Sequence, residues 1–116
     1  NFVLDLIHSS KGIAVMAHPY MFNNIELLKD LIAKGKIDGI EVDHYSADEN
    51  QRAELRRIAE ENGLIITGGS DFHGMYNSNV AYIGSNVTDE ENINKLYLYF
   101  PLFITTIQLP IVIIYN

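Results

Sequence analysis

Residues 64–74 read LIITGGSDFHG, an apolar run that ends in two glycines and a cluster of polar residues. A short apolar run bounded by glycine is typical of a strand that is buried on both faces. Two stretches upstream follow the same plan: GIAVMAHP at residues 12–19 and GIEVDHY at residues 39–45. The strands that we predict from these stretches are Ile13–Ala17, Ile37–Val42 and Leu64–Thr67.

Helical patterns separate the three predicted strands. Apolar residues recur at helical spacing ahead of Gly12, Gly35 and Gly63, which close the patterns in the manner of C-terminal caps. The apolar faces that we predict are Phe2, Leu6 and Ile7, then Ile25, Leu28 and Ile32, then Leu55, Ile58 and Ala59. Strand–helix units that follow one another with short connections indicate an α/β fold with parallel strands.

The helix starts and the end of the chain are predicted from local signals. Two capping boxes, Ser46 with Glu49 and Thr88 with Glu91, are expected to open the third and fourth helices. We expect Pro101 to end or kink the fourth helix. Val80–Ile83 predicts a further strand. Three or four such strands fit either an open sheet or a segment of a barrel.

The composition excludes several classes of protein. The chain has 116 residues, of which 47% are hydrophobic, so it can form one core but not two ordinary domains. The formal charge of -7 argues against a surface that coats nucleic acid. The chain contains no cysteine, which excludes disulfides, thiolate zinc sites and a cysteine nucleophile. Because it begins with Asn1 rather than methionine, we expect it to be a piece of a larger protein.

The C-terminal tail from Leu96 to Tyr115 carries no charge. It is long enough to span a membrane. However, its prolines and polar residues weaken a spanning helix, and its Ile, Val, Phe and Tyr content favours buried strands. A membrane anchor and a terminus foreign to the fold are the two alternatives.

Residues suited to metal binding follow each predicted strand. The first strand leads to His18, the second carries Glu41 and leads to His44, and the third leads to Asp71 and His73. Ligands and catalytic groups collect at the carboxyl ends of parallel strands. Two imidazoles and one carboxylate suit zinc, manganese or iron, and the absence of thiolates favours a hydrolytic site.

Each of these residues also has an ordinary structural interpretation. Asp71 and His73 can cap a turn, and His18 can bond to a backbone carbonyl. Glu41 either supports a metal ligand from behind or pairs with a nearby base. For His44, a solvated loop position competes with contact to a substrate phosphate, and we favour the loop position.

The three strand-end stretches resemble the C-terminal part of the PHP (polymerase and histidinol phosphatase) superfamily. The resemblance covers roughly residues 4–84, and its most specific element is SDFHG after an apolar strand and two glycines. It implies a distorted seven-stranded (βα) barrel with parallel strands, incomplete in this chain. It also implies that His18, Asp71 and His73 are metal ligands, with two or three manganese, zinc or iron ions in the complete site.

The function that the resemblance implies is hydrolysis of phosphate esters by the longer parent protein. The expected substrates are small phosphorylated molecules, including nucleotides and short RNA ends, and the expected location is the cytoplasm. The opening HxH element and the earlier ligands of the family have no counterpart here. The alternative is therefore a catalytically inert remnant with weak or no metal binding.

The resemblance also predicts how the chain is organised. Residues 1–90 are expected to form the C-terminal part of a PHP-type domain, and residues 91–116 a terminal helix and an apolar tail. Three or four strands cannot close a barrel, so the open sheet edges are expected to need the missing N-terminal half or self-association.

Overall fold

The computed structural model describes residues 2–76, 81–99 and 111–114. A four-stranded parallel sheet in the order β3-β2-β1-β4 forms its centre. The strands are β1 (Ile13–Met16), β2 (Gly39–Asp43), β3 (Ile65–Gly68) and β4 (Ile111–Ile114). The helices are α1 (Phe2–Ser9), α2 (Ile25–Ala33), α3 (Glu49–Glu61) and α4 (Glu90–Leu98), and a single 3₁₀ turn spans Gly74–Tyr76.

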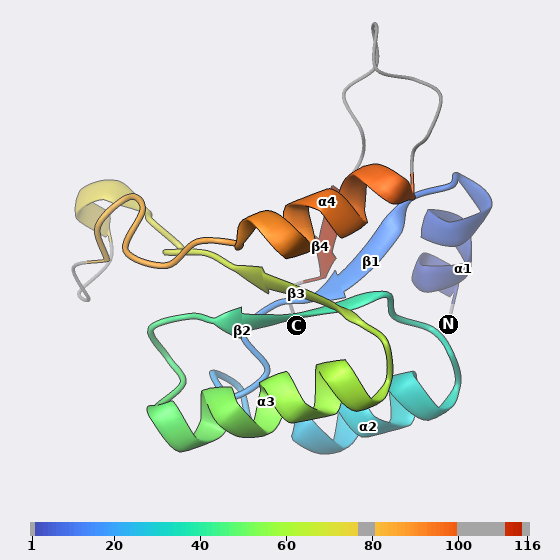
Figure 1. Ribbon diagram of the computed structural model, residues 1–116, viewed down its shortest axis with the longest axis horizontal. Helices are drawn as coiled ribbons and strands as arrows, with labels where there is room; N and C mark the ends of the chain where they lie inside the picture. Colours follow the sequence, from blue (N-terminus) through green and yellow to red (C-terminus); the bar gives the residue numbers. More distant parts are fainter. Residues whose placement is uncertain (1, 77–80, 100–110, 115–116) are drawn as a thin grey trace, which may run out of the picture.

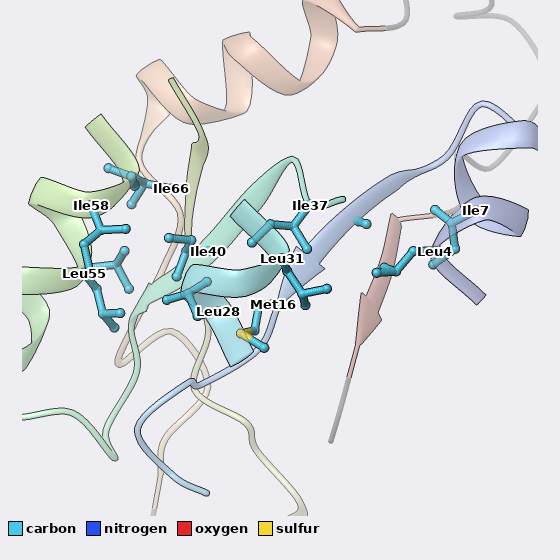
Figure 2. Close-up of a cluster of buried hydrophobic side chains, with 13 residues drawn as sticks. Leu4, Ile7, Met16, Leu28, Leu31, Ile37, Ile40, Leu55, Ile58 and Ile66 are labelled. Carbon is cyan, nitrogen blue, oxygen red and sulfur yellow. The ribbon is translucent and has the colours of Figure 1, made fainter. Parts of the chain in front are cut away.

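Helices cover both faces of the sheet. In Figure 1, α2 and α3 lie together on one face and α4 lies on the other. The larger core combines side chains of α1, α2 and α3 with alternate residues of the strands, among them Met16, Ile40 and Ile66, as Figure 2 shows. A smaller cluster on the opposite face joins Ile13, Val15 and Ile65 to Leu96 of α4. Because the two clusters use alternate strand residues, the apolar runs of the sequence are buried on both faces.

The first three predicted strands and the parallel α/β architecture are confirmed, with ends displaced by one or two residues. The prediction of a strand at Val80–Ile83 is wrong for residues 81–83, which belong to no strand, and Val80 lies outside the described residues. The fourth strand comes instead from the uncharged tail, where β4 pairs with β1 from Ile13↔Ile111 to Met16↔Ile114. The seven strands of a complete barrel stay a prediction.

The predicted helix faces are corrected in part. Leu4 and Ile7 are the buried residues of α1, while Phe2 and Leu6 are exposed. In α2, Leu28 and Leu31 are buried and Ile25 and Ile32 only partly so. The face predicted for α3 is confirmed. In short helices, a shift of one residue in the apolar stripe is enough to exchange buried and exposed positions.

Both predicted capping boxes are wrong by one or two residues. The Asp48 side chain caps α3 and forms a capping box with Gln51. Asp89 caps α4 by accepting from the backbone N–H of Asn92. In each case an acidic residue after the predicted Ser or Thr takes the cap position, which suits the positive end of the helix dipole.

Thr88, which was predicted to cap α4, hydrogen-bonds to the outer edge of β3 instead. The Gly68 N–H donates to Thr88 Oγ1 at 3.1 Å, and the Ile66 N–H donates to Asn92 Oδ1 at 2.9 Å. These two N–H groups point away from β2, so a neighbouring strand would otherwise have to satisfy them. Side chains of the α4 segment therefore occupy this edge of the sheet.

A side-chain hydrogen bond joins α1 to the start of the sheet. His8 Nε2 lies 2.8 Å from Asp38 Oδ2, and the same oxygen accepts the backbone N–H of Ala14 at 2.8 Å. His8 and the backbone of β1 therefore share one oxygen of the Asp38 carboxylate. Among the described residues, none of the helices is long and apolar enough to cross a bilayer. Pro101 and most of the tail lie outside the described residues.

Replacing Leu28 with alanine tests the larger core. Leu28 is 0% exposed, whereas its neighbour Leu27 is 38% exposed. We expect Leu28→Ala to lower the free energy of unfolding by about 2–5 kcal/mol, because it removes buried methyl groups and leaves a cavity. Urea denaturation measures the change, and Leu27→Ala is the matched control with a much smaller effect. Equal losses in the two variants would contradict the placement of α2.

Replacing Asn92 with alanine tests the edge of β3. Asn92 is 3% exposed, and its loss leaves the Ile66 N–H without its acceptor. We expect the free energy of unfolding to fall by about 1–3 kcal/mol, the usual range for an unsatisfied buried donor. Asn94→Ala on the exposed side of α4 is the control. Hydrogen exchange at Ile66 provides a second reading, and an unchanged exchange rate in Asn92→Ala would refute the contact.

Candidate functional site

The carboxyl ends of β1, β2 and β3 bring four of the predicted residues together. The rings of His18 and His44 have centroids 5.0 Å apart. His44 Nε2 lies 3.8 Å from Asp71 Oδ2, and His73 Nδ1 lies 3.3 Å from Asp71 Oδ1. Asp71 is therefore the centre of the cluster, with one imidazole near each of its oxygens.

The backbone at two of the predicted ligands is strained. His18 has a φ of 27° and Asp71 a φ of 49°, both in the left-handed region that L-residues seldom adopt. Such conformations cost about 1–3 kcal/mol each and persist where the surrounding structure imposes them, often at functional sites. The left-handed turn at Asp71 brings its side chain and that of His73 together.

Other groups closely approach the backbone of the two glycines before Asp71. A Cβ atom at Gly68 would lie 2.4 Å from the carbonyl oxygen of Val87, and one at Gly69 would lie 2.8 Å from Glu41 Oε1. Neither glycine has a positive φ. The two glycines therefore allow close approach, and they let the Glu41 carboxylate reach across the strand ends.

Glu41 holds the backbone of His18. Its Oε2 accepts the His18 N–H at 2.8 Å, which ties the end of β1 to β2. Burial raises the pKa of Glu41 above its ordinary value, and the Asp71 carboxylate adds to the rise, while the bond from His18 opposes it. Asp43 has a different partner, because Arg56 Nη2 of α3 donates to Asp43 Oδ2 at 3.0 Å. The register between β2 and β3 shifts between Glu41 and Asp43, and this shift separates the two carboxylates.

His73 is the exposed member of the cluster, with 59% of its side chain accessible. Its Nδ1 lies 2.6 Å from the carbonyl oxygen of Asp71. Because a carbonyl only accepts, Nδ1 carries a proton, and in the neutral imidazole Nε2 then keeps its lone pair. Metal-binding histidines usually donate their second nitrogen in this way, so His73 is in the tautomer that binds a metal through Nε2.

His44 is not the solvated loop residue that the sequence suggested. It is 0% exposed, and it packs against the rings of His18 and Tyr45. Burial lowers the pKa of His44 below its ordinary value, and the neighbouring His18 contributes in the same direction. The apolar strand that precedes His44 was the one signal of burial that the sequence offered.

Sequence reasoning missed the residues that hold the loop after β2. Arg52 donates from Nε to the Ala47 carbonyl at 3.0 Å and from Nη2 to the His44 carbonyl at 2.9 Å. Arg57, by contrast, pairs with Glu61 on the exposed side of α3.

Tyr20 ties the segment after His18 to α3. Its hydroxyl donates to Glu54 Oε2, and burial followed by this contact raises the pKa of Tyr20 to about 12. Phe22 is exposed, with its ring centroid 5.7 Å from that of His18 in an edge contact. Tyr20 therefore packs on the core, whereas Phe22 lies beside the site.

The residues fit a metal individually but not as a complete set. Imidazole and carboxylate are the expected donors, and His73 has the right tautomer. However, in residues 2–76 and 81–99 no group of three or more His, Cys, Asp or Glu side chains is arranged to hold an ion. A complete site would need further ligands or a rearrangement of those present.

Comparison with known proteins gives relatives that are much longer than this chain. No family model matches it. It is 40% identical over 78 residues to a phosphoribosyl 1,2-cyclic phosphate 1,2-diphosphodiesterase of Eggerthella lenta, a match that covers 66% of this chain and 28% of that protein. It is 38% identical over 74 residues to the 5'-3' exoribonuclease Rnm of Escherichia coli, covering 60% of this chain and 25% of that protein.

A solved structure from Bifidobacterium adolescentis, provisionally described as a metal-dependent phosphoesterase, also matches. It shares 38% sequence identity with a TM-score of 0.55, and the match covers 64% of this chain and 25% of that one. The chain thus spans about a quarter of the length of the proteins it resembles.

Proposed function

We propose that this chain is the C-terminal part of a metal-dependent phosphoesterase and supplies part of its metal site. The observation that carries the proposal is the convergence of His18, His44, Asp71 and His73 at the carboxyl ends of three consecutive parallel strands. The similar proteins support it, because their names describe a phosphodiesterase, an exoribonuclease and a metal-dependent phosphoesterase.

In this proposal His18, Asp71 and His73 are the metal ligands. Glu41 fixes the backbone of His18, and Gly69 leaves room for the Glu41 carboxylate. The bond from His73 Nδ1 to the Asp71 carbonyl directs Nε2 of His73 away from the backbone. A bound divalent cation supplies the positive charge and Lewis acidity that hydrolysis of a phosphate ester requires.

The proposed substrates are phosphate esters of small molecules, including nucleotides and short RNA ends. A net charge of -7 disfavours an anionic substrate unless cations offset it locally, which is what a metal site provides. The remaining ligands and strands are proposed to come from the longer parent protein. The proposed division places the PHP-type domain at residues 1–90 and its terminal helix and tail at residues 91–116.

A chimera tests the proposal in a complete site. The matched residues of this chain, 66% of its length, replace their counterparts in the Eggerthella lenta relative. We expect the chimera to hydrolyse a phosphate ester in the presence of Mn²⁺ and to lose activity when a chelator removes the metal. Asp71→Asn is expected to lower kcat/KM by more than about 100-fold, since a lost ligand should cost at least as much as a lost supporting group.

Asp30→Asn is the matched control, because Asp30 lies on the exposed side of α2 and its carboxylate pairs with Lys34. Circular dichroism establishes that each variant is folded. A folded Asp71→Asn chimera with full Mn²⁺-dependent turnover would exclude Asp71 as a ligand. A folded chimera that lacks turnover altogether would favour the inert remnant.

A further inference from the structure

Nδ1 of His44 is an acceptor in the structure. The backbone N–H of Ser46 points at it with an N···N distance of 3.2 Å, and Ser46 Oγ lies 2.7 Å away. A backbone N–H can only donate, so Nδ1 must offer its lone pair. The imidazole of His44 therefore carries one proton, and that proton is on Nε2.

The position of His44 is fixed by its loop. Its carbonyl accepts from Arg52 Nη2 at 2.9 Å and from the Ala47 N–H at 3.2 Å, and its own N–H donates to the Val42 carbonyl at 3.1 Å. The side chain is fully buried. The ring is held in one orientation, with Nε2 directed toward the carboxylate of Asp71.

The two imidazoles beside Asp71 are thus in opposite tautomers. His73 donates from Nδ1 to a carbonyl and keeps the Nε2 lone pair, whereas His44 accepts at Nδ1 and keeps the Nε2 proton. A histidine that binds a metal through Nε2 needs a lone pair there. His44 lacks it, although its Nε2 is buried in the site.

Nε2 of His44 has no hydrogen-bond partner among the described residues, which is rare for a buried polar atom. The carboxylate oxygen Asp71 Oδ2 lies 3.8 Å from it. This distance exceeds that of a hydrogen bond by less than about 1 Å.

We propose that His44 is a positioning residue: its Nε2–H donates to Asp71 Oδ2 and so fixes the orientation of the carboxylate that would bind a cation. The inference rests on the proposed function for the role of Asp71 as a ligand. Carboxylates that bind metals usually also accept a hydrogen bond from a neighbouring group that does not touch the metal, and His44 supplies such a donor. His44 is then excluded as a ligand.

Long-range ¹H–¹⁵N spectra of the chain near neutral pH test the tautomer without metal or substrate. We expect His44 to show a protonated Nε2 and an unprotonated Nδ1, and His73 the reverse. Asp71→Asn should shift the Nε2 proton of His44, whereas Asp30→Asn should not. A proton on Nδ1 of His44, or a resonance indifferent to Asp71→Asn, overturns the proposal.

Addition of Zn²⁺ to the same sample distinguishes a ligand from a positioning residue. We expect the Nε2 proton of His44 to persist as Zn²⁺ binds, and its loss would make His44 a ligand. Ser46→Ala removes Oγ but leaves the backbone donor, so the tautomer should be unchanged.

Two variants of similar size distinguish the hydrogen-bond donor of His44 from the packing of its side chain. His44→Gln places an amide donor near the position of Nε2. The shorter side chain of His44→Asn extends only to the position of Nδ1, beside Ser46. We expect His44→Asn to raise the Kd for Zn²⁺ by about 10- to 100-fold and His44→Gln to keep most of the affinity. Equal weakening in two folded variants would reduce His44 to a structural residue.

The two proposals fail in different ways. If no imidazole of the chain responds to Zn²⁺ and the chimera is inactive, the proposed function fails while the tautomer of His44 is still read directly. If the chimera is active and its Asp71→Asn variant is not, but His44 carries its proton on Nδ1, only the inference about His44 fails.

Discussion

The parallel pairing of β1, β2 and β3 is the constraint on which the rest of the structure depends. The register aligns Val15 with Gly39 and Ile40 with Ile66, so the three strands end at the same edge of the sheet. Parallel strands require crossover helices, and the helices bury the opposite faces of the sheet. The side chains that follow each strand are therefore delivered to one place before any specific contact is made.

Specific contacts then convert this alignment into a site. The Glu41 carboxylate bonds to the His18 backbone, and Gly69 leaves the room that it needs. The loop after β2 is held by Arg52, which fixes the His44 ring against His18. Strained backbone at His18 and Asp71 is maintained by these neighbours, as is usual where geometry matters more than local stability.

Much of the fold was predictable because the apolar runs are short, continuous and separated by helical patterns. The helix starts were not, since Asp48 and Asp89 compete as caps with the hydroxyl residues just before them. Thr88 illustrates the reason: the free edge of β3 uses its hydroxyl, and that edge is created only when the sheet forms. The tail strand β4 was likewise ambiguous, because its apolar composition does not specify a partner.

The sequence by itself determined the parallel α/β core and the grouping of His18, Asp71 and His73 at the strand ends, since strand order and spacing carry that information. Only the tertiary structure decided what each imidazole does. His44 and His73 are alike in the sequence, each a histidine close behind a strand. One meets a backbone N–H and the other a carbonyl, and the identity of that neighbour fixes which nitrogen keeps its proton. Hydrogen-bond partners of this kind depend on the path of the backbone, which no residue pattern specifies.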